Sequence, residues 1–448
     1  MESPNLTFLF CLFTLFTYIY LIVKHKTVLM GFTIMASLQV AINTISYFFI
    51  SYSSGIGMEE FGPYHYFVYN YMAASLIAMA AGIWLAWRPL RENKPLVNPF
   101  VAEPDLIKLF AVIGAIALFL SVVLPNISTL SAIIQKFYSF LAISVIAGLV
   151  LWRATKNSRP LLFAAAVFLP TGILYMAISG HVSILGAFLL HPLLVFSCWR
   201  RPRVPQFLLM FAGLFLFYVV GGVWLEARLL LRTEVIKGNA FEKAVQFVPE
   251  FIGQILSFES FKLESIQQAA RNRLDLSSFQ VAQAAYMPEG HPYDMGKGLF
   301  LDPIAAIIPR FLWPNKTFTM GDNEHINKYT GAAFKQDAIS VDTVIAFDFY
   351  ANFGWIGVVF GMFLFGYLSA SLELKLFTKG VTLRRVFIYC MILLSFSTGG
   401  RRVSVMAMEI GAGIVGSLLL AEFLKFTGLF RTTFNKQVVF TALKNKRN

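Results

Sequence analysis

The sequence predicts an all-α, polytopic membrane protein with about 11 transmembrane helices and one large helical loop on the outer face of the membrane. The 448 residues are 57% hydrophobic and only 14% charged, whereas about a quarter of the residues in a soluble protein are usually charged. The apolar residues come in runs of about 20, which is the length that crosses a bilayer core. Because backbone groups in lipid must find partners within their own segment, each run is expected to be a helix.

Hydropathy places eight candidate spans before one long polar segment and three spans after it. The candidate spans are residues 7–23, 28–51, 66–87, 107–124, 135–152, 161–178, 182–199, 207–230, 343–368, 384–397 and 403–423. The chain is therefore predicted to comprise transmembrane helices 1–8 (residues 1–231), a large outer loop (232–342), transmembrane helices 9–11 (343–423) and a basic tail (424–448).

The basic residues predict how these spans are threaded. Lysine and arginine occur in every second loop, for example at 88–94 and 200–203, and in the tail, whereas loops such as 53–64 contain neither. The positive-inside rule then places the N-terminus outside and the C-terminus in the cytoplasm. The outer loop has 11 basic and 13 acidic residues, so the net charge of +13 belongs to the cytoplasmic edge and does not indicate a nucleic-acid partner.

No nucleotide-binding motif is found in the sequence, and the predicted cytoplasmic loops are short and basic. Cys11, Cys198 and Cys390 lie in or beside apolar runs and have no disulfide or metal-ligand pattern. A membrane enzyme with its polar part outside must use a substrate that arrives already activated, because ATP and sugar nucleotides are cytoplasmic. A lipid-linked phosphate or pyrophosphate fits this requirement, and we expect no cofactor.

Arginine and lysine side chains near the outer surface are the candidates for binding such a substrate. Guanidinium groups are always charged and offer a planar fork to phosphate oxygens. Arg401 and Arg402 are the most informative pair, because they lie in a short outer loop where the orientation rule disfavours basic residues. Snorkelling to lipid phosphates is the alternative explanation. The other candidates are Arg271, Arg273, Arg310 and Lys316.

Polar side chains inside the ninth span are a second signal. Asp348 and Asn352 are four residues apart and share one helical face, with Tyr350 on another face. A carboxylate in a membrane span usually faces a cavity or a partner and is a functional candidate, and an ion pair with a neighbouring helix is the alternative. Gly354, Gly357 and Gly361 follow on the same span, where close helix packing explains them.

The outer loop is expected to be mostly helical. Residues 264–286 carry apolar side chains at three- and four-residue spacing, which is typical of an amphipathic helix. Residues 287–298 (MPEGHPYDMGKG) are rich in turn formers, and residues 304–315 (IAAIIPRFLWPN) predict a helix that ends before Pro314. The aromatic side chains of this loop, Trp313 among them, suit stacking on a sugar or an interfacial aromatic belt.

The segment GDNEH contains the last candidates. Asp322, Glu324 and His325, together with Asp294 and Asp302, have ligand atoms that could hold Mg²⁺ or Mn²⁺. A short acidic cluster after glycine is more typical of a turn, so we predict no metal site. His325 is instead a candidate acid–base group.

Several of these stretches together resemble a known family. They are Ile308 to Lys316 (IPRFLWPNK), Gly321, Phe349 to Leu368 (FYANFGWIGVVFGMFLFGYL), the upstream Arg273-Leu-Asp and the HPYDMGKG turn. They look like the outer loop and following span of the bacterial oligosaccharide repeat-unit polymerases, the Wzy-type O-antigen polymerases. One difference is Thr317, where the family pattern often has proline.

The resemblance implies a metal-independent glycosyltransferase of the helical, lipid-phosphosugar (GT-C-like) type in the bacterial inner membrane, working at the periplasmic face. Its substrates would be undecaprenyl-pyrophosphate-linked oligosaccharides, and a chain-length regulator and a flippase are implied partners beside membrane lipids. Arg310 and Arg273 would hold the donor pyrophosphate, and Asp348, His325 or Tyr350 would orient or deprotonate the acceptor hydroxyl. The implied substrate-binding residues are Lys316, Arg401, Arg402, Trp313, Asn352 and Arg271.

Two other functions remain open from the sequence. An O-antigen ligase shares the general architecture but transfers the chain to the lipid A core. A lipid-linked oligosaccharide flippase or other transporter would move its substrate without forming a bond, and usually contains structural repeats. The arginine-containing outer loop of about 110 residues argues against a transporter, because alternating access needs no outer domain of that size.

Overall fold

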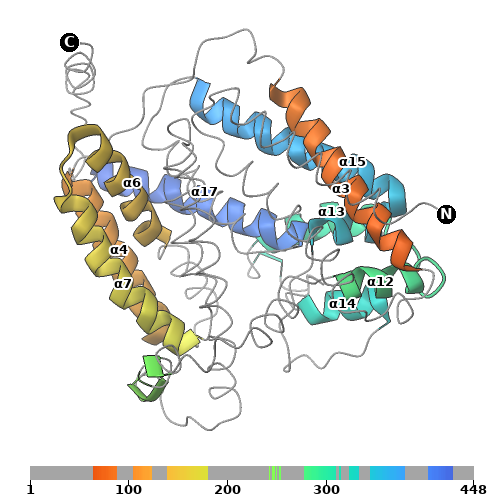
Figure 1. The fold of residues 1–448 in the computed structure, drawn as a ribbon, viewed down its shortest axis with the longest axis horizontal. Coiled ribbons are helices and arrows are strands. Elements are labelled where there is room, and N and C mark those ends of the chain that lie inside the picture. The colour runs from red at the N-terminus through yellow and green to blue at the C-terminus, as the bar shows by residue number, and fades with distance from the viewer. Residues whose placement is uncertain are drawn as a thin grey trace. The chain divides into compact units, whose positions relative to one another are not determined.

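In the computed structural model, the described part of the chain consists of helices joined by turns and loops, and no strand occurs there (Figure 1). The described residues are 64–87, 104–123, 139–179, 277–308, 312–313, 322–331, 344–378 and 402–426, with scattered positions between 242 and 253. The helices are α3 (Tyr64–Trp87), α4 (Pro104–Val123), α6 (Ser139–Thr155), α7 (Arg159–Ser179), α12 (Ser277–Tyr286), α13 (Lys297–Ile307), α14 (Asp322–Thr330), α15 (Ile345–Thr378) and α17 (Val403–Phe426). The predicted all-α class is thereby confirmed for these residues.

The predicted spans that fall on described residues are all helices. They correspond to α3, α4, α6, α7, α15 and α17. The largest difference is at the end of α15, which was predicted at residue 368 and lies at Thr378, because Glu373 and Lys375 end the apolar run but are good helix formers. The candidate spans 7–23, 28–51, 182–199, 207–230 and 384–397 lie outside the described residues.

One helix in the described part of the chain, Ile345–Leu372, is long and apolar enough to cross a membrane. This supports membrane association of that segment, while the number of spans and their orientation stay predictions.

The chain divides into two compact units. Unit 1 comprises Met1–Pro95, Gln267–Lys375 and Ser395–Gly411, and unit 2 comprises Leu96–Ile266, Leu376–Leu394 and Ala412–Asn448. Unit 1 therefore combines α3 with the second half of the predicted outer loop, most of α15 and the start of α17. The domain boundaries predicted at 231 and 342 follow the membrane topology and stay a prediction.

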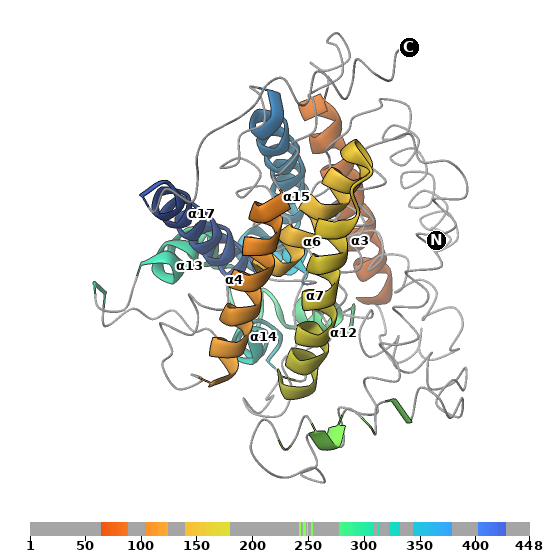
Figure 2. The same ribbon diagram turned by 90° about the vertical axis from the view of Figure 1, so that its left-hand side faces the viewer.

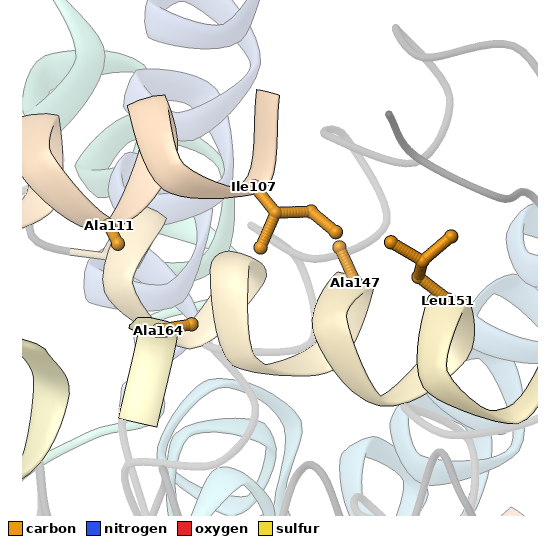
Figure 3. Packing of buried hydrophobic residues seen from close by; sticks show 5 residues of the cluster. All are labelled: Ile107, Ala111, Ala147, Leu151 and Ala164. Carbon is orange, nitrogen blue, oxygen red and sulfur yellow. The ribbon is translucent and has the colours of Figure 1, made fainter. Parts of the chain in front are cut away.

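In unit 2, α4, α6 and α7 pack side by side as a three-helix bundle (Figure 2). Its core is apolar and combines large side chains with alanines, which allow the helices to approach closely. One buried cluster joins Ile107 and Ala111 of α4 to residues of α6 and α7 (Figure 3). Gly114 of α4 lies against the backbone of Leu141, and a Cβ atom there would be only 2.5 Å from the Leu141 nitrogen.

In unit 1, α3 and α15 lie side by side (Figure 1). Their backbones touch at two glycines. A Cβ atom on Gly82 of α3 would overlap the carbonyl oxygen of Phe363, and one on Gly366 of α15 would overlap the carbonyl oxygen of Met79. This close crossing fixes the position of α15 within the unit, and with it the polar residues near its start.

Helix α15 is sharply kinked near its start. Phe353 and Gly354 have non-helical backbone angles, and Gly354 has φ 59°, which favours glycine. The part before the kink lies against the part after it, because the Phe349 carbonyl oxygen and ring occupy the space where Gly357 and Gly361 would carry a Cβ atom. Gly357 and Gly361 are therefore closely packed, but against Phe349 of their own helix and not against a second helix as predicted.

The segment that precedes α15 corrects two sequence predictions. The helix predicted over 304–315 begins earlier and ends earlier, since α13 runs from Lys297 to Ile307. Ile308 is extended because it precedes Pro309, and the residue before proline avoids the α-helical conformation. The GDNEH segment was expected to be a turn but supplies the first residues of α14, since acidic side chains are favourable at a helix N-terminus. The turn-rich break before α13 is confirmed.

Candidate functional site

The structure brings together several residues that the sequence singled out. Asp348 and Asn352 of α15, His325 of α14 and Arg402 just before α17 are all buried and all belong to unit 1. Trp313, by contrast, is an exposed side chain. The predicted residues Arg271, Arg273, Arg310, Lys316 and Arg401 lie outside the described residues.

A histidine–carboxylate pair lies at the centre of the site. The Nε2 atom of His325 is 2.7 Å from Oδ1 of Asp348, and both side chains are less than a tenth exposed. With Nε2–H donating to the carboxylate, Nδ1 carries the lone pair of the neutral ring. The edge of the His325 ring packs on Tyr329 one helical turn on, at 4.8 Å between ring centres. The ring is therefore held in one orientation.

The second oxygen of Asp348 is also used. It accepts the backbone N–H of Val403 at 2.6 Å, and Val403 is the first residue of α17. The first N–H groups of a helix have no partner within it and favour a negative charge. Asp348 thus joins α14 to the start of α17 through its two oxygens, which leaves it placed to orient His325 rather than to accept a further proton.

Arg402 lies at this same helix start and is 1% exposed. Its carbonyl oxygen accepts the N–H of Met406 at 3.0 Å, so Arg402 is the residue from which α17 begins. A buried guanidinium keeps its charge and must be balanced by neighbouring anions. Asp302 of α13 is close enough for Arg402 to affect its titration.

Asp302 lies at the edge of the charged group that His325, Asp348 and Arg402 form. Burial raises the pKa of the Asp302 carboxyl above its ordinary value, and the opposing charges of His325, Arg402 and Lys328 reduce this effect without cancelling it. The sequence had offered Asp302 only as a metal ligand. Among the described residues, no three histidine, cysteine or acidic side chains lie close enough to hold a metal ion.

A second polar cluster was missed by the sequence analysis. Lys328 donates to Oδ2 of Asp294 at 2.6 Å and to the hydroxyl of Tyr329 at 3.0 Å, and the Tyr329 hydroxyl donates to the same carboxylate oxygen. Burial raises the pKa of Asp294, but the bonds from Lys328 and Tyr329 outweigh burial and hold the pKa below its ordinary value. Burial and Asp294 raise the pKa of the Tyr329 hydroxyl.

The signal for this cluster was present in the sequence. His325 and Tyr329 are four residues apart, so they share one face of any helix that contains them, and Lys328 is adjacent. Recognising residues 322–330 as a helix would have placed these side chains together. The expected turn hid that relation.

Amide side chains line the same interior. The Nδ2 group of Asn352 donates to the Asp348 carbonyl oxygen at 2.8 Å, as expected for residues on one helical face. Gln283 of α12 donates to the Phe347 carbonyl oxygen at 3.0 Å. Within the described part of the chain, the side-chain oxygens of Asn352, Gln280 and Gln283 find no hydrogen-bond donor. Each of these buried oxygens therefore keeps a lone pair that a hydroxyl group could satisfy.

Tyr350 faces a different environment. Its ring packs edge-on against Phe67 and Tyr71 of α3, at 5.5 and 5.6 Å between ring centres. It also contacts Tyr293 at 5.9 Å. Tyr350 thus lies in an aromatic cluster on the opposite side of the α15 start from His325, which agrees with the predicted difference in face.

The arrangement supplies an oriented imidazole, a buried guanidinium and free amide acceptors within one interior. An imidazole of this kind can remove a proton from a hydroxyl group. A guanidinium can stabilise a phosphate or another developing negative charge. Amide oxygens can accept hydrogen bonds from sugar hydroxyls.

The comparisons with known proteins give a family without an activity. A family model described as "Domain of unknown function (DUF8712)" matches residues 17–378, which is most of the chain. No curated protein and no solved structure matches the sequence. The chain belongs to the DUF8712 family.

Proposed function

We propose that this DUF8712 member is a membrane glycosyltransferase that polymerises undecaprenyl-pyrophosphate-linked oligosaccharide repeat units at the periplasmic face of the bacterial inner membrane. The product would be an O-antigen or a related surface polysaccharide. The sequence resemblance to Wzy-type polymerases suggests the reaction, and the candidate site supplies groups suited to it. The proposal includes about 11 membrane spans, with the N-terminus in the periplasm and the C-terminus in the cytoplasm.

One observation carries the proposal. His325, Asp348 and Arg402 come from three segments far apart in the sequence and meet in one buried interior. Burying charged groups costs free energy, and removing one partner from a buried pair is typically destabilising by about 3–5 kcal/mol. If this interior only had to stabilise the fold, apolar side chains could occupy it instead. Buried ionisable side chains that come together in this way are candidates for a functional site.

In the proposed reaction, His325 is the general base. Its Nδ1 atom takes the proton from a hydroxyl of the acceptor repeat unit while that oxygen bonds to the anomeric carbon of the donor chain. Asp348 holds the imidazole in the required tautomer and stabilises the charge that the ring gains. Of the three candidates for the acceptor base, His325 is preferred because both Asp348 oxygens are engaged and Tyr350 packs among aromatic rings.

The bond that breaks joins the anomeric carbon to the pyrophosphate of the carrier lipid. Undecaprenyl pyrophosphate leaves with the bonding electrons, so negative charge grows on its oxygens. Arg402 stabilises that charge, together with Arg310, Arg273, Lys316, Arg401 and Arg271. Asn352 accepts hydrogen bonds from sugar hydroxyls, and Trp313 stacks on a sugar ring. No metal ion is required, because the cations of the protein supply the electrostatic stabilisation.

The direct test is a gel of lipid-linked products. The purified protein is incubated in EDTA, without nucleotide, with an undecaprenyl-pyrophosphate oligosaccharide extracted from its own host. We expect a ladder of regularly spaced bands. Unaltered single units from a folded protein would contradict the proposal, and addition of a lipid A core acceptor would then identify a ligase if the units were transferred to it.

Arg310 provides an independent variant test. Losing a cation that stabilises the leaving group typically lowers a rate by about a hundredfold or more. We therefore expect Arg310→Ala to nearly abolish the ladder and Arg310→Lys to restore it only partly, because lysine lacks the bidentate fork. A ladder of normal length and amount from Arg310→Ala would remove this residue from the site.

A further inference from the structure

Helix α13 presents an apolar face that its own unit does not cover. Phe300, Leu301 and Ile304 are all exposed, and Phe300 is 67% exposed. Positions 300, 301 and 304 follow the three- and four-residue spacing of one helical face. The neighbouring Met295 is exposed as well. Apolar side chains gathered on one face of a short helix indicate a contact with an apolar partner.

Another face of α13 is turned toward the candidate site. Ala305 is buried, and Gly298 lies against the side chains of Asn352 and Tyr329, at 3.4–3.6 Å from where its Cβ would be. Asp302 shares this side of the helix, and the nearby His325 and Arg402 affect the pKa of its carboxyl group. The orientation of α13 is therefore fixed by the site, and its exposed face must point away from it.

Helix α13 is attached directly to the kink of α15. The N–H groups of Asp294 and Met295 donate to the carbonyl oxygens of Ala351 and Asn352 at 3.1 and 3.0 Å. In an uninterrupted helix those carbonyls would bond to N–H groups four residues on, and the kink at Gly354 frees them. The loop that leads into α13 thus replaces the lost helical bonds.

The exposed face of α13 continues into the exposed face of α15. Phe353 and Phe300 both lie within 3.1 Å of where a Cβ on Gly296 would be, so these two rings are neighbours. Beyond Phe353, the exposed stripe of α15 is apolar for several turns. It consists of Ile356, Phe360, Leu364 and Leu368, of which Ile356 and Phe360 are each 70% exposed. This stripe belongs to the one described helix that is long enough to cross a membrane.

From this continuity we infer that α13 is an interfacial helix whose Phe300, Leu301 and Ile304 insert into the outer surface of the lipid bilayer beside α15. A helix with one apolar face lies in the plane of the headgroup region with that face in the acyl chains. Lys297, on the exposed side, reaches the lipid phosphates in the way that lysine commonly does at an interface.

This inference concerns the surface that the lipid covers and does not depend on the reaction proposed above. It also predicts the depth of the candidate site, because α13 separates the charged group from the bilayer surface.

Spin-label accessibility in a bilayer tests the inference. In the full-length chain with Cys11, Cys198 and Cys390 replaced by alanine, one cysteine at a time is introduced and spin-labelled at Phe300, Ile304, Ile356 or Glu289. The first three are expected to face lipid, whereas Glu289 lies on the exposed turn before α13. Each protein is placed in bilayers of phosphatidylethanolamine and phosphatidylglycerol, and collisions with oxygen and with a water-soluble nickel chelate are measured.

The expected result is an oxygen-to-nickel ratio at positions 300 and 304 that is close to that at 356 and several-fold above that at 289. Because these side chains are exposed, the label displaces no core contact, and unchanged thermal unfolding confirms the fold. Ratios at 300 and 304 like that at 289 would place α13 in water and overturn the inference. If the labels at 300 and 304 were accessible to neither reagent, a protein partner would cover this face. If the label at Ile356 were exposed to water, α15 itself would lie outside the lipid. Either result would also overturn the inference.

Discussion

The interior of unit 1 is polar and charged where α14, α15 and α17 meet, whereas the interior of the three-helix bundle in unit 2 is apolar. Among the described residues, His325, Asp348 and Arg402 are buried in unit 1. The buried clusters of α4, α6 and α7 consist of residues such as Ile107, Leu141 and Phe168. The buried Ser144 of that bundle donates to the Leu141 carbonyl oxygen of its own helix.

The difference shows what each region contributes. Apolar packing stabilises a fold without specific chemistry, because every buried methyl group contributes in much the same way. Buried charges must be paired and bonded to be tolerated, so they are costly as structural elements. We therefore propose that the bundle stabilises the fold and that the interior of unit 1 performs the chemistry, and substitutions in the two regions should separate these effects.

The largest expected effect is on the rate of polymerisation in Asp348→Asn. Asparagine keeps the shape and can still accept the Val403 N–H, but its amide would donate to His325 Nε2 and move the ring proton to Nδ1. The base would then be lost. Because general base catalysis contributes about 10²–10⁴-fold, we expect a loss of a hundredfold or more in product formation per folded molecule. A rate within a few-fold of wild type would show that Asp348 is structural.

The counterpart in unit 2 is Leu141→Ala. Leu141 is fully buried in the bundle, and a leucine-to-alanine change in a core typically costs about 2–5 kcal/mol of stability. We expect a lower thermal unfolding temperature with an unchanged rate for the fraction that remains folded. A rate that fell further than the folded fraction would break the division of roles between the two regions.

Gly357→Ala should disturb the kink that shapes unit 1. Its Cβ atom would overlap the Phe349 carbonyl oxygen, so relief requires movement of backbone. Overpacking of this kind typically costs about 1–3 kcal/mol. The matched control is Gly253→Ala, since a Cβ atom on Gly253 meets nothing within 4 Å. Equal unfolding temperatures for the two variants would contradict the close packing within α15.

The smallest expected effects are changes in stability with pH. They should have opposite signs for the carboxyl groups of Asp302 and Asp294. The raised pKa of Asp302 means that its ionisation opposes folding, so Asp302→Asn should stabilise the protein at neutral pH, and this effect should disappear as the wild-type carboxyl is protonated. The lowered pKa of Asp294 means that its ionised form supports folding. Asp294→Asn should therefore destabilise the protein above about pH 4, with a difference that disappears as the wild-type carboxyl is protonated.

Thermal unfolding of both variants across this pH range measures the effects, which we expect to be a few degrees at most because both groups are partly solvated. Changes of the same sign in the two variants would contradict the assigned environments.

The helices of the described segments were predictable from the sequence, because long apolar runs and their charged ends are local signals. The span predicted at 66–87, for instance, corresponds to α3 at Tyr64–Trp87. The end of α13 was predicted wrongly. The helix was expected to end before Pro314, whereas it ends at Ile307, before the earlier Pro309. The kink at Gly354 was not predicted, because glycine in a helix indicates close packing as readily as a bend.

The site was predictable residue by residue but not as an assembly. Helical periodicity placed Asp348 and Asn352 on one face, and residue chemistry selected His325 and Arg402. Their meeting depends on how α14 and the start of α17 pack against α15, and such long-range contacts leave no trace in one sequence. The pairing of Lys328 with Asp294 was missed for the same reason, since the two residues lie 34 positions apart and form an ion pair only in the fold.

The most direct test of the account is the rate of product formation by His325→Ala, with and without added imidazole. His291→Ala is the matched control, because it removes a histidine from the neighbouring loop that has no role in the proposed reaction. We expect a loss of about a hundredfold or more in His325→Ala, partial recovery with imidazole, and a near-normal rate in His291→Ala. A folded His325→Ala protein that formed the ladder at the wild-type rate would contradict the claim that this buried pair performs the chemistry.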